Sequence, residues 1–590
     1  MGLDLKIVGG TIVDGTGRPA YRGDIGIEGG VITAVGDAPG VARRVIDADG
    51  ALVTPGFVDV HTHYDGQISW DEALAPSVSH GVTTVVMGNC GVGFAPVRPT
   101  DHERLIRLME GVEDIPGSAL AEGLSWDWET LPEYMDALDR RPHTIDFSVQ
   151  APHDAVRVYV MGERALADEE ATDDDIARMR ALVGEALDAG AVGFSTGRSD
   201  VHRTADGDWT PASEASTREL VGIAEAFRGR AHGVLQAVSD FDYERAPERF
   251  DAEFDVLERM VEASGGRPFS LSLMQRDLVP RQWRQILARS EQAAARGLTW
   301  RVQVAPRAIG VNVGLQCTFH PFMGFPSYKA ISGLPLGERV AAMRDPAFRE
   351  RLLTERSEPL AGDGTAIPPL VDKFLAAIEM IAFKLFALGD DPDYEQPIER
   401  SLGARAQGLG LPPLRVVYDA LLEDDGRALL YFPIYNYTEF NYQNVLTMMR
   451  HPQAIPGLSD GGAHVGTVCD ASFPTYLLSY WTRDRKGEQL GLPRAVQMLT
   501  ADTARHIGYR DRGLLAPGMK ADVNVIDHAN LRLRAPRMVQ DLPAGGQRLL
   551  QAARGYKATI VAGEVVVEDD AVTDARPGRL ARIGPSGQAV

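Results

Sequence analysis

The sequence predicts an α/β protein in which a (β/α)8 barrel of the TIM type is joined to a small discontinuous β-sandwich made from the N- and C-terminal segments. Through the middle of the 590-residue chain, short apolar runs alternate with amphipathic helical stretches. This alternation indicates parallel strands joined by crossover helices, and so many units favour a closed barrel. The two ends instead consist of short alternating β segments. A chain of this length also exceeds one ordinary hydrophobic core.

The two ends of the chain are predicted to form one domain. Residues 4–53 contain three β segments in which apolar and polar residues alternate, with glycine or Asp-Gly at the turns. Residues 521–533 and 557–572 repeat this pattern. Neither end has enough strands to bury a face alone, so we expect them to pack together. The predicted domains are the β-sandwich, residues 1–54 and 509–590, and the barrel, residues 55–508.

The barrel strands are expected where apolar runs of strand length recur. Helical stretches separate them, and residues 173–190 and 250–266 have apolar positions three and four apart. Two regions, near 97–140 and 319–425, interrupt this rhythm, and we expect them to be insertions on the active-site side. The expected strand segments are 57–60, 81–88, 143–150, 190–197, 232–238, 268–274, 299–305 and 455–462.

The composition excludes several classes of partner. The formal net charge is −22, from 82 acidic and 60 basic side chains, and such a surface repels nucleic acid and anionic membranes. No basic segment followed by an apolar run opens the chain, and no stretch approaches the ~20 apolar residues of a membrane span. The three cysteines are far apart, which suits a reducing compartment. We expect a cytoplasmic protein, with homo-oligomerisation left open.

The strongest local signal is TPGFVDVHTHYDGQ, residues 54–67. Its FVDV segment is a predicted strand, and His61 and His63 follow at the end of this strand. Side chains two apart on a strand face the same way. Two imidazoles at the carboxyl end of a barrel strand can therefore bind one metal ion, where barrel enzymes keep their chemistry.

Two further residues could complete a metal centre. Cys90 ends the next apolar strand, in GVTTVVMGNCGVG; thiolate is a good zinc ligand, although a free cysteine is often only a small buried hydrophobe. Asp460 stands where the strand IPGL gives way to a glycine-rich loop. A carboxylate there can bind the metal and accept a proton from water. The alternative for Asp460 is an ordinary Asp-Gly turn.

The order of these motifs resembles that of the D-aminoacylase (N-acyl-D-amino-acid deacylase) branch of the amidohydrolase superfamily. The motifs are HTHYDG, GNCG, GFSTG and SDG, followed by GLLAPGMKADVNVID, and the likeness covers nearly the whole chain. The resemblance implies that Cys90 replaces the carboxylated lysine that bridges two metals in other members. It also implies that Asp460 is the general base.

The sequence departs from this family on the fifth and sixth strands. The family normally supplies one histidine from each, but here Gln236 and Leu273 are expected in those places. The second metal position would then lack two ligands, since leucine is no ligand and an amide oxygen binds zinc poorly. We therefore expect one zinc ion per chain, with another divalent metal left open.

Other polar residues on the predicted loops are candidates for substrate binding. An arginine after the fourth strand could hold a substrate carboxylate through two hydrogen bonds, or could be a solvated loop residue. A loop histidine is more often structural. The aromatic run at residues 431–442 could form an apolar wall for an acyl group, or could be core. The candidates are His153, Arg198, His202, Arg203, Gln236, Arg307 and His464.

The predicted function is metal-dependent hydrolysis of a C–N amide bond in a small molecule. The ion would lower the pKa of a water and polarise the carbonyl, and Asp460 would move the proton. The resemblance implies an N-acyl-D-amino acid as the substrate. One alternative is a different amide, such as a cyclic imide, a ureide or a larger amide compound. Another is a barrel that only binds metal or ligand, against which the retained metal ligands argue.

Overall fold

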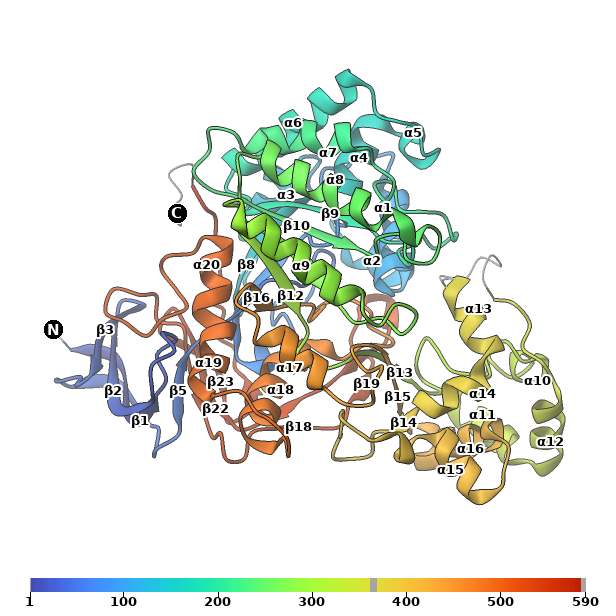
Figure 1. The fold of residues 1–590 in the computed structure, drawn as a ribbon. Helices are drawn as coiled ribbons and strands as arrows, with labels where there is room; N and C mark the ends of the chain where they lie inside the picture. The colour runs from blue at the N-terminus through green and yellow to red at the C-terminus, as the bar shows by residue number, and fades with distance from the viewer. Residues whose placement is uncertain (1, 361–368, 585–590) are drawn as a thin grey trace.

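The centre of the molecule is a barrel of eight parallel strands (Figure 1). The structure, a computed structural model, describes residues 2–360 and 369–584. A parallel bridge between Thr62 and Gly461 joins the two outer strands of the sheet, and this contact closes the barrel. The predicted fold class is confirmed. In sheet order the strands are β6 (Phe57–Asp59), β7 (Val82–Met87), β8 (Asp146–Pro152), β9 (Gly193–Arg198), β10 (Val234–Ser239), β11 (Phe269–Leu273), β12 (Trp300–Val304) and β16 (Ala454–Pro456).

Helices cover the outside of the barrel. The predicted helical stretches correspond to α6 (Asp173–Asp188) and α8 (Phe250–Ala263). Thr172 starts α6 with a capping box, because its side chain accepts from the N–H of Asp175 while the Asp175 side chain accepts from the Thr172 N–H. The barrel strands are buried on both faces, as in β7 and β11, where every residue is buried. Other covering helices are α4 (His153–Met161), α7 (Thr217–Ala224), α9 (Gln282–Ala295), α17 (Gln443–Met449), α18 (Phe473–Ser479), α19 (Leu492–Gln497) and α20 (Thr503–Ile507).

Strands from both ends of the chain share one nine-stranded sheet. The C-terminal strand β17 (Val523–Ile526) pairs antiparallel with the N-terminal strand β5 (Leu52–Pro55). Side chains from both ends, among them Ile25 and Ile560, form a separate hydrophobic core. The discontinuous β domain is therefore confirmed. Its other strands are β1 (Leu3–Ile12), β2 (Tyr21–Glu28), β3 (Val31–Gly36), β4 (Ala42–Asp47), β22 (Tyr556–Val561), β23 (Glu564–Glu568) and β24 (Ala571–Val572).

Two insertions interrupt the barrel. Residues 309–435, between β12 and β16, form a lobe with its own hydrophobic core; the lobe lies on the far side of the barrel from the nine-stranded sheet (Figure 1). The predicted insertion near 319–425 falls within this lobe, and residues 361–368 lie outside the described part. The lobe contains β13 (Ile309–Val313), α10 (Pro326–Lys329), α11 (Leu336–Arg344), α12 (Pro346–Thr354), α13 (Pro369–Ala376), α14 (Ile378–Ile381), β14 (Phe386–Ala387), α15 (Leu402–Leu409), α16 (Pro413–Leu421) and β15 (Leu430–Tyr435). The predicted insertion near 97–140 contains α1 (His102–Glu113), α2 (Gly117–Gly123) and α3 (Leu131–Asp139). Among the described residues, no helix combines the length and apolar character needed to cross a membrane.

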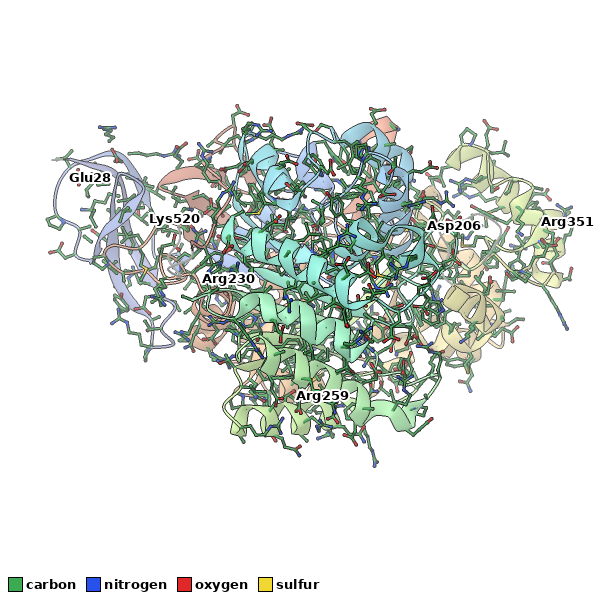
Figure 2. All side chains as sticks on the ribbon, turned by 90° about the horizontal axis from the view of Figure 1, so that it is seen from above. Glu28, Asp206, Arg230, Arg259, Arg351 and Lys520 are labelled. Carbon is green, nitrogen blue, oxygen red and sulfur yellow. The ribbon has the colours of Figure 1, made fainter. Side chains whose placement is uncertain are left out.

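A buried group of charged side chains joins the barrel to the nine-stranded sheet. Arg512 donates to Asp146, the first residue of β8, at 2.6 Å, and both side chains are almost fully buried. Lys520, which lies between the two parts in Figure 2, is 2.9 Å from Asp146 and 2.7 Å from Asp522. The two positive side chains hold the pKa of Asp146 below its usual value despite burial.

We predict that Arg512→Met destabilises the protein strongly, because it leaves a buried carboxylate short of one partner. The expected loss is roughly 3–5 kcal/mol of unfolding free energy, measured by urea or thermal unfolding. Arg44→Met is the matched control, since Arg44 pairs with Glu568 where both side chains are about half exposed, and such pairs contribute about 0–1 kcal/mol. Equal stabilities of the two variants would contradict the prediction.

Candidate metal centre

A pocket of about 300 Å³ opens at the carboxyl ends of the barrel strands. Its floor carries most of the site residues that the sequence predicted, and its apolar wall comes from the lobe, including Phe374 and Phe432. This location is where (β/α)8 barrels keep their active sites. The predicted residues that line the pocket are His61, His63, Cys90, His202, Asp460 and His464.

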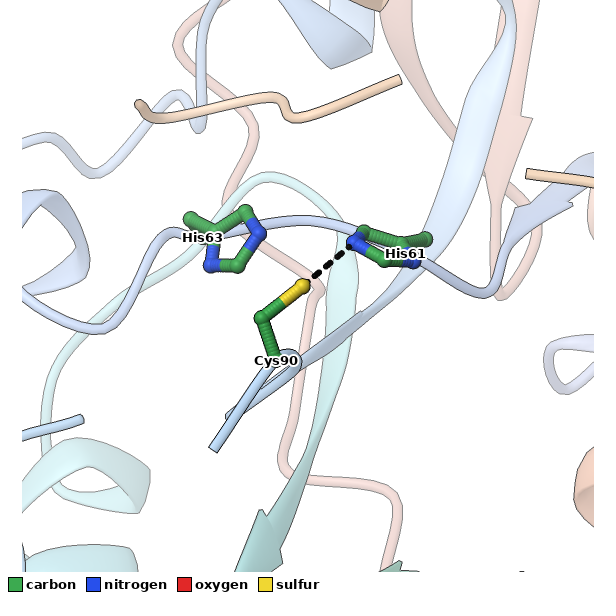
Figure 3. A group of neighbouring side chains, drawn as sticks. All are labelled: His61, His63 and Cys90. Atoms are coloured by element: carbon green, nitrogen blue, oxygen red, sulfur yellow. Dashed lines mark hydrogen bonds between the residues drawn. The ribbon is translucent and has the colours of Figure 1, made fainter. Parts of the chain in front are cut away.

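His61, His63 and Cys90 point toward one another at the floor of the pocket (Figure 3). Their ligand atoms all lie within 4.8 Å of one another, and the three side chains are buried. The two histidines follow β6 and the cysteine follows β7, so two neighbouring strands position the group. Burial lowers the pKa of His61 to about 4 and that of His63 well below its usual value, which keeps both imidazoles neutral, as metal ligands must be.

The backbone around Cys90 is folded tightly to aim its sulfur inward. Cys90 has a left-handed backbone, with φ +57°, and donates its N–H to Gln236 Oε1 at 2.9 Å. A Cβ added at Gly91 would lie 2.8 Å from the backbone nitrogen of Gly197, so glycine is required there. Burial, with the carboxylate of Asp460, raises the pKa of the thiol well above its usual value.

Asp460 follows β16, the strand next to β6 at the barrel closure, and lies at the same pocket floor. Its backbone N–H donates to the carbonyl of His61 at 3.2 Å, and its own φ is +50°. Its Oδ1 is buried without a hydrogen-bond partner among the described residues. Burial raises the pKa of this carboxyl to about 7. A left-handed backbone together with a buried, unpaired carboxylate oxygen favours the functional interpretation of Asp460 over an ordinary turn residue.

The spacing of these four side chains fits a divalent ion. In a tetrahedral zinc site, Zn–N distances of about 2.0 Å and Zn–S of about 2.3 Å place neighbouring ligand atoms about 3.3–3.5 Å apart. His61 Nε2 lies 3.2 Å from Cys90 Sγ and 3.4 Å from Asp460 Oδ1. His63 Nε2 lies 3.7 Å from the same oxygen. A cation at this place would reverse the raised acid pKa values, because it favours the deprotonated ligands.

Two polar residues that the sequence analysis missed lie behind the histidines. Gln303 Oε1 is 2.6 Å from His61 Nδ1, and Glu113 Oε1 is 3.2 Å from His63 Nδ1. Both contacts leave Nε2 of each ring facing the metal place. A polar residue in the middle of the apolar segment TWRVQVA was a usable signal for Gln303, whereas Glu113 lies in an insertion and carried none.

Strands five and six supply no histidine, but one predicted position is corrected. Gln236 faces the site, where it accepts from Cys90. Leu273 does not, because its side chain is part of the core under the helices. Its neighbour Ser272 lines the pocket instead. The alternation of side chains along β11 explains the one-residue error.

Besides Gln236, four of the predicted substrate-binding residues do not line the pocket, and we correct their assignment to structural roles. Arg198 is buried against Glu253 at 2.8 Å, and Arg307 is buried against Asp470 at 3.0 Å. An arginine with a buried carboxylate partner is not free to bind a substrate. The other two are His153, whose ring nitrogens contact Thr196 and Glu219, and Arg203, which stacks on Trp209.

The cation that does line the pocket is Arg276, just after β11. Its two terminal nitrogens donate to Gln282 and to the carbonyl of Ser239, each at 2.9 Å. A guanidinium has five N–H groups, so three remain for other acceptors.

The aromatic run 431–442 is divided between the pocket and the core. Phe432 and Tyr435 line the pocket, whereas several of its tyrosines belong to the hydrophobic core.

Comparison with known proteins shows the family of the chain. The sequence model of the amidohydrolase family matches residues 44–567. N-acyl-D-glutamate deacylase of Alcaligenes xylosoxydans xylosoxydans is 28% identical over 593 aligned residues, which cover 98% of this chain and 96% of that protein. D-aminoacylase of the same organism is 36% identical over 236 residues, 40% of this chain and 44% of its own length. That match spans less than half of the relative.

A solved structure shares the whole fold. N-acyl-D-glutamate deacylase from Bordetella bronchiseptica, in complex with zinc and a phosphonate inhibitor, superimposes with a TM-score of 0.62 at 25% identity and covers 99% of this chain and 100% of that one. The resemblance to the D-aminoacylase branch is thereby confirmed, and metal dependence with it.

We predict that His61→Ala, His63→Ala and Cys90→Ala each lose the bound metal. Each change removes one of the few protein ligands that hold a divalent ion while leaving a place for water. Elemental analysis after dialysis measures the metal content. His451→Ala is the control, because His451 contacts Glu291 away from the pocket. Full metal content in any of the three ligand variants would contradict the assignment of that residue.

Proposed function

Because the chain belongs to the amidohydrolase family, we propose that it cleaves the amide bond of an N-acyl-D-amino acid into a carboxylate and a free D-amino acid. The observation that carries the proposal is the group of His61, His63 and Cys90 with Asp460 beside it, at the carboxyl end of the barrel. The acyl-D-amino-acid relatives support the substrate class. Cytoplasmic location and action on a small molecule stay part of this proposal.

The proposed cofactor is one zinc ion per chain. His61, His63 and Cys90 would hold it, and Asp460 would be the weaker fourth ligand. A second ion would share Cys90 with strands five and six, where Gln236 and Ser272 face the site. Neither amide oxygen nor hydroxyl competes with imidazole for zinc. The absence of a histidine there supports a single tight ion.

The chemistry needs a group that takes and returns a proton. When bound, the divalent ion lowers the pKa of a water and polarises the amide carbonyl. Asp460 accepts the proton of the attacking water and gives it to the leaving nitrogen. Burial alone raises the pKa of this carboxyl to about 7, and the bound cation would lower it again, so that Asp460 is ionised and can accept the proton. The side chains of His61 and His63 at the pocket floor are buried, and such low-dielectric surroundings strengthen these interactions.

Binding of the substrate carboxylate requires a positively charged side chain in the pocket. Arg276 lines the pocket, and three of its five N–H groups are not used in hydrogen bonds to Gln282 and Ser239. Arg276 would therefore bind this carboxylate. The predicted arginines Arg198 and Arg307 are paired elsewhere. This shortage of free cations favours, as the second candidate, hydrolysis of a neutral amide such as a cyclic imide or ureide. A panel of N-acyl-D- and N-acyl-L-amino acids, cyclic imides and dipeptides with the zinc-loaded protein distinguishes the two candidates.

We predict that Asp460→Asn lowers kcat by roughly 10²-fold or more, the scale of general acid–base catalysis. The amide keeps the shape of the side chain but cannot accept the proton, so KM should change much less. Steady-state kinetics with the best substrate of the panel measure both. Asp206→Asn is the control, since Asp206 is half exposed on the outer surface (Figure 2). Near-full activity of Asp460→Asn would make Asp460 a turn residue.

We also predict that Arg276→Met raises KM strongly for substrates with a free carboxylate and little for their amides. The reason is the loss of the charged partner of that carboxylate. Arg203→Met is the matched control, because its guanidinium stacks on Trp209 outside the pocket. If Arg276→Met affected both substrate types equally, the neutral-amide candidate would be preferred.

A further inference from the structure

We propose that Glu113, from the end of α1, is a positioning residue of the metal centre. One carboxylate oxygen orients His63 through Nδ1, and the other holds His464 at the pocket wall. This inference rests on the proposed function only in that His63 binds the ion through Nε2. It gives the 97–140 insertion a direct part in building the site.

The contact between Glu113 and His63 is buried and isolated. Nδ1 lies 3.2 Å from Oε1, and the two side chains are 2% and 1% exposed. In this structure the N–H is not aimed at the oxygen, and Nδ1 has no hydrogen bond among the described residues. A ring bound to metal through Nε2 carries its proton on Nδ1. A small rotation then aims this N–H at Oε1, which satisfies both buried groups.

The second oxygen of Glu113 faces His464. Oε2 is buried without a hydrogen-bond partner in the described part of the chain, and it lies 3.6 Å from His464 Nε2. His464 has a left-handed backbone, with φ +49°, and lines the pocket. The carboxyl group of Glu113 thus stands between a predicted metal ligand and a pocket histidine, with one oxygen facing a ring nitrogen of each.

Hydrogen bonds to neighbouring segments hold the end of α1, and with it Glu113, in place. The N–H of His464 donates to the carbonyl of Glu113. The next residue, Asp114, ends the helix in a left-handed conformation, and its Oδ2 accepts from the hydroxyl of Thr467 at 3.1 Å. It also accepts from Thr318 of the lobe. The position of Glu113 is therefore fixed by contacts among three segments of the chain: the end of α1, residues 464–467 and Thr318 of the lobe.

The two proposed histidine ligands have unlike supports. His61 is held by the neutral amide of Gln303, whereas His63 has a carboxylate behind it. A carboxylate behind an imidazole increases its basicity as well as fixing its orientation, and loss of such a partner weakens metal binding by about 10–100-fold. Removal of Glu113 should therefore weaken the hold on the ion without abolishing it.

The test compares three variants in a metal-binding assay without substrate. Glu113→Gln keeps an oxygen for the N–H but removes the charge, and Glu113→Ala removes both. Glu103→Gln is the control, an exposed glutamate in the first turn of the same helix. Competition with a chromophoric chelator measures zinc affinity, and visible spectra of the cobalt-loaded proteins report ligand geometry. Melting temperatures of the metal-free proteins check folding.

The expected order of zinc affinity is control, then Glu113→Gln, then Glu113→Ala, with the last about 10–100-fold weaker than the control. The cobalt spectrum of Glu113→Ala should keep the thiolate band of Cys90 but show shifted d–d bands. Unchanged affinity and spectra in both variants would overturn the proposal. So would a loss as complete as that of His63→Ala, which would make Glu113 a ligand itself. Failure of N-acyl-D-amino acids as substrates would leave this order untouched.

Discussion

The closure of the barrel between β6 and β16 is the contact on which the site depends. The backbone N–H of His63 donates to the carbonyl of Gly461, and the backbone N–H of Asp460 donates to the carbonyl of His61. Two segments almost 400 residues apart in the sequence are therefore hydrogen-bonded to each other. These backbone bonds place both imidazoles and the carboxylate on one floor before any metal is present. The other two parts are placed around this closure. The lobe contributes an apolar pocket wall, and the α1 insertion contributes Glu113 behind His63.

The barrel, the shared sheet and the meeting of His61, His63 and Cys90 could be predicted from the sequence, because these features depend on local pattern. A histidine pair at the end of a strand, and a cysteine at the end of the next, meet whenever parallel strands are neighbours. Roles that depend on a partner from elsewhere were not visible. Arg198 and Arg307 look free in sequence, and only the fold brings Glu253 and Asp470 against them.

Two other failures have different causes. Leu273 was misplaced because one residue of error on a strand exchanges the inner and outer faces. Glu113 was missed because nothing in an insertion reveals which of its acidic residues turns inward. It sits at the last position of α1, among several other carboxylates in the same region, and only its burial separates it from them. Arg276 was also missed, because nothing in its local sequence indicates that it lines the pocket.

The site also couples metal to protons. Burial keeps the Cys90 thiol protonated, raises the pKa of Asp460 to about 7 and keeps the two histidines neutral. In that state the floor of the pocket is close to uncharged, which is why so many ionisable groups can be buried together. Binding of a divalent ion displaces those protons. The same low-dielectric surroundings that hold the protons then strengthen the hold on the cation.

The interleaving of the nine-stranded sheet has a consequence for biosynthesis. During translation, β5 leaves the ribosome with one edge open, because its partner β17 begins at Val523. At 5–20 residues per second the missing strand arrives roughly 20–90 s later. For that time the nascent chain exposes an apolar strand edge, the kind of surface that other chains can pair with. The N-terminal strands therefore complete their sheet only after the whole barrel has been synthesised.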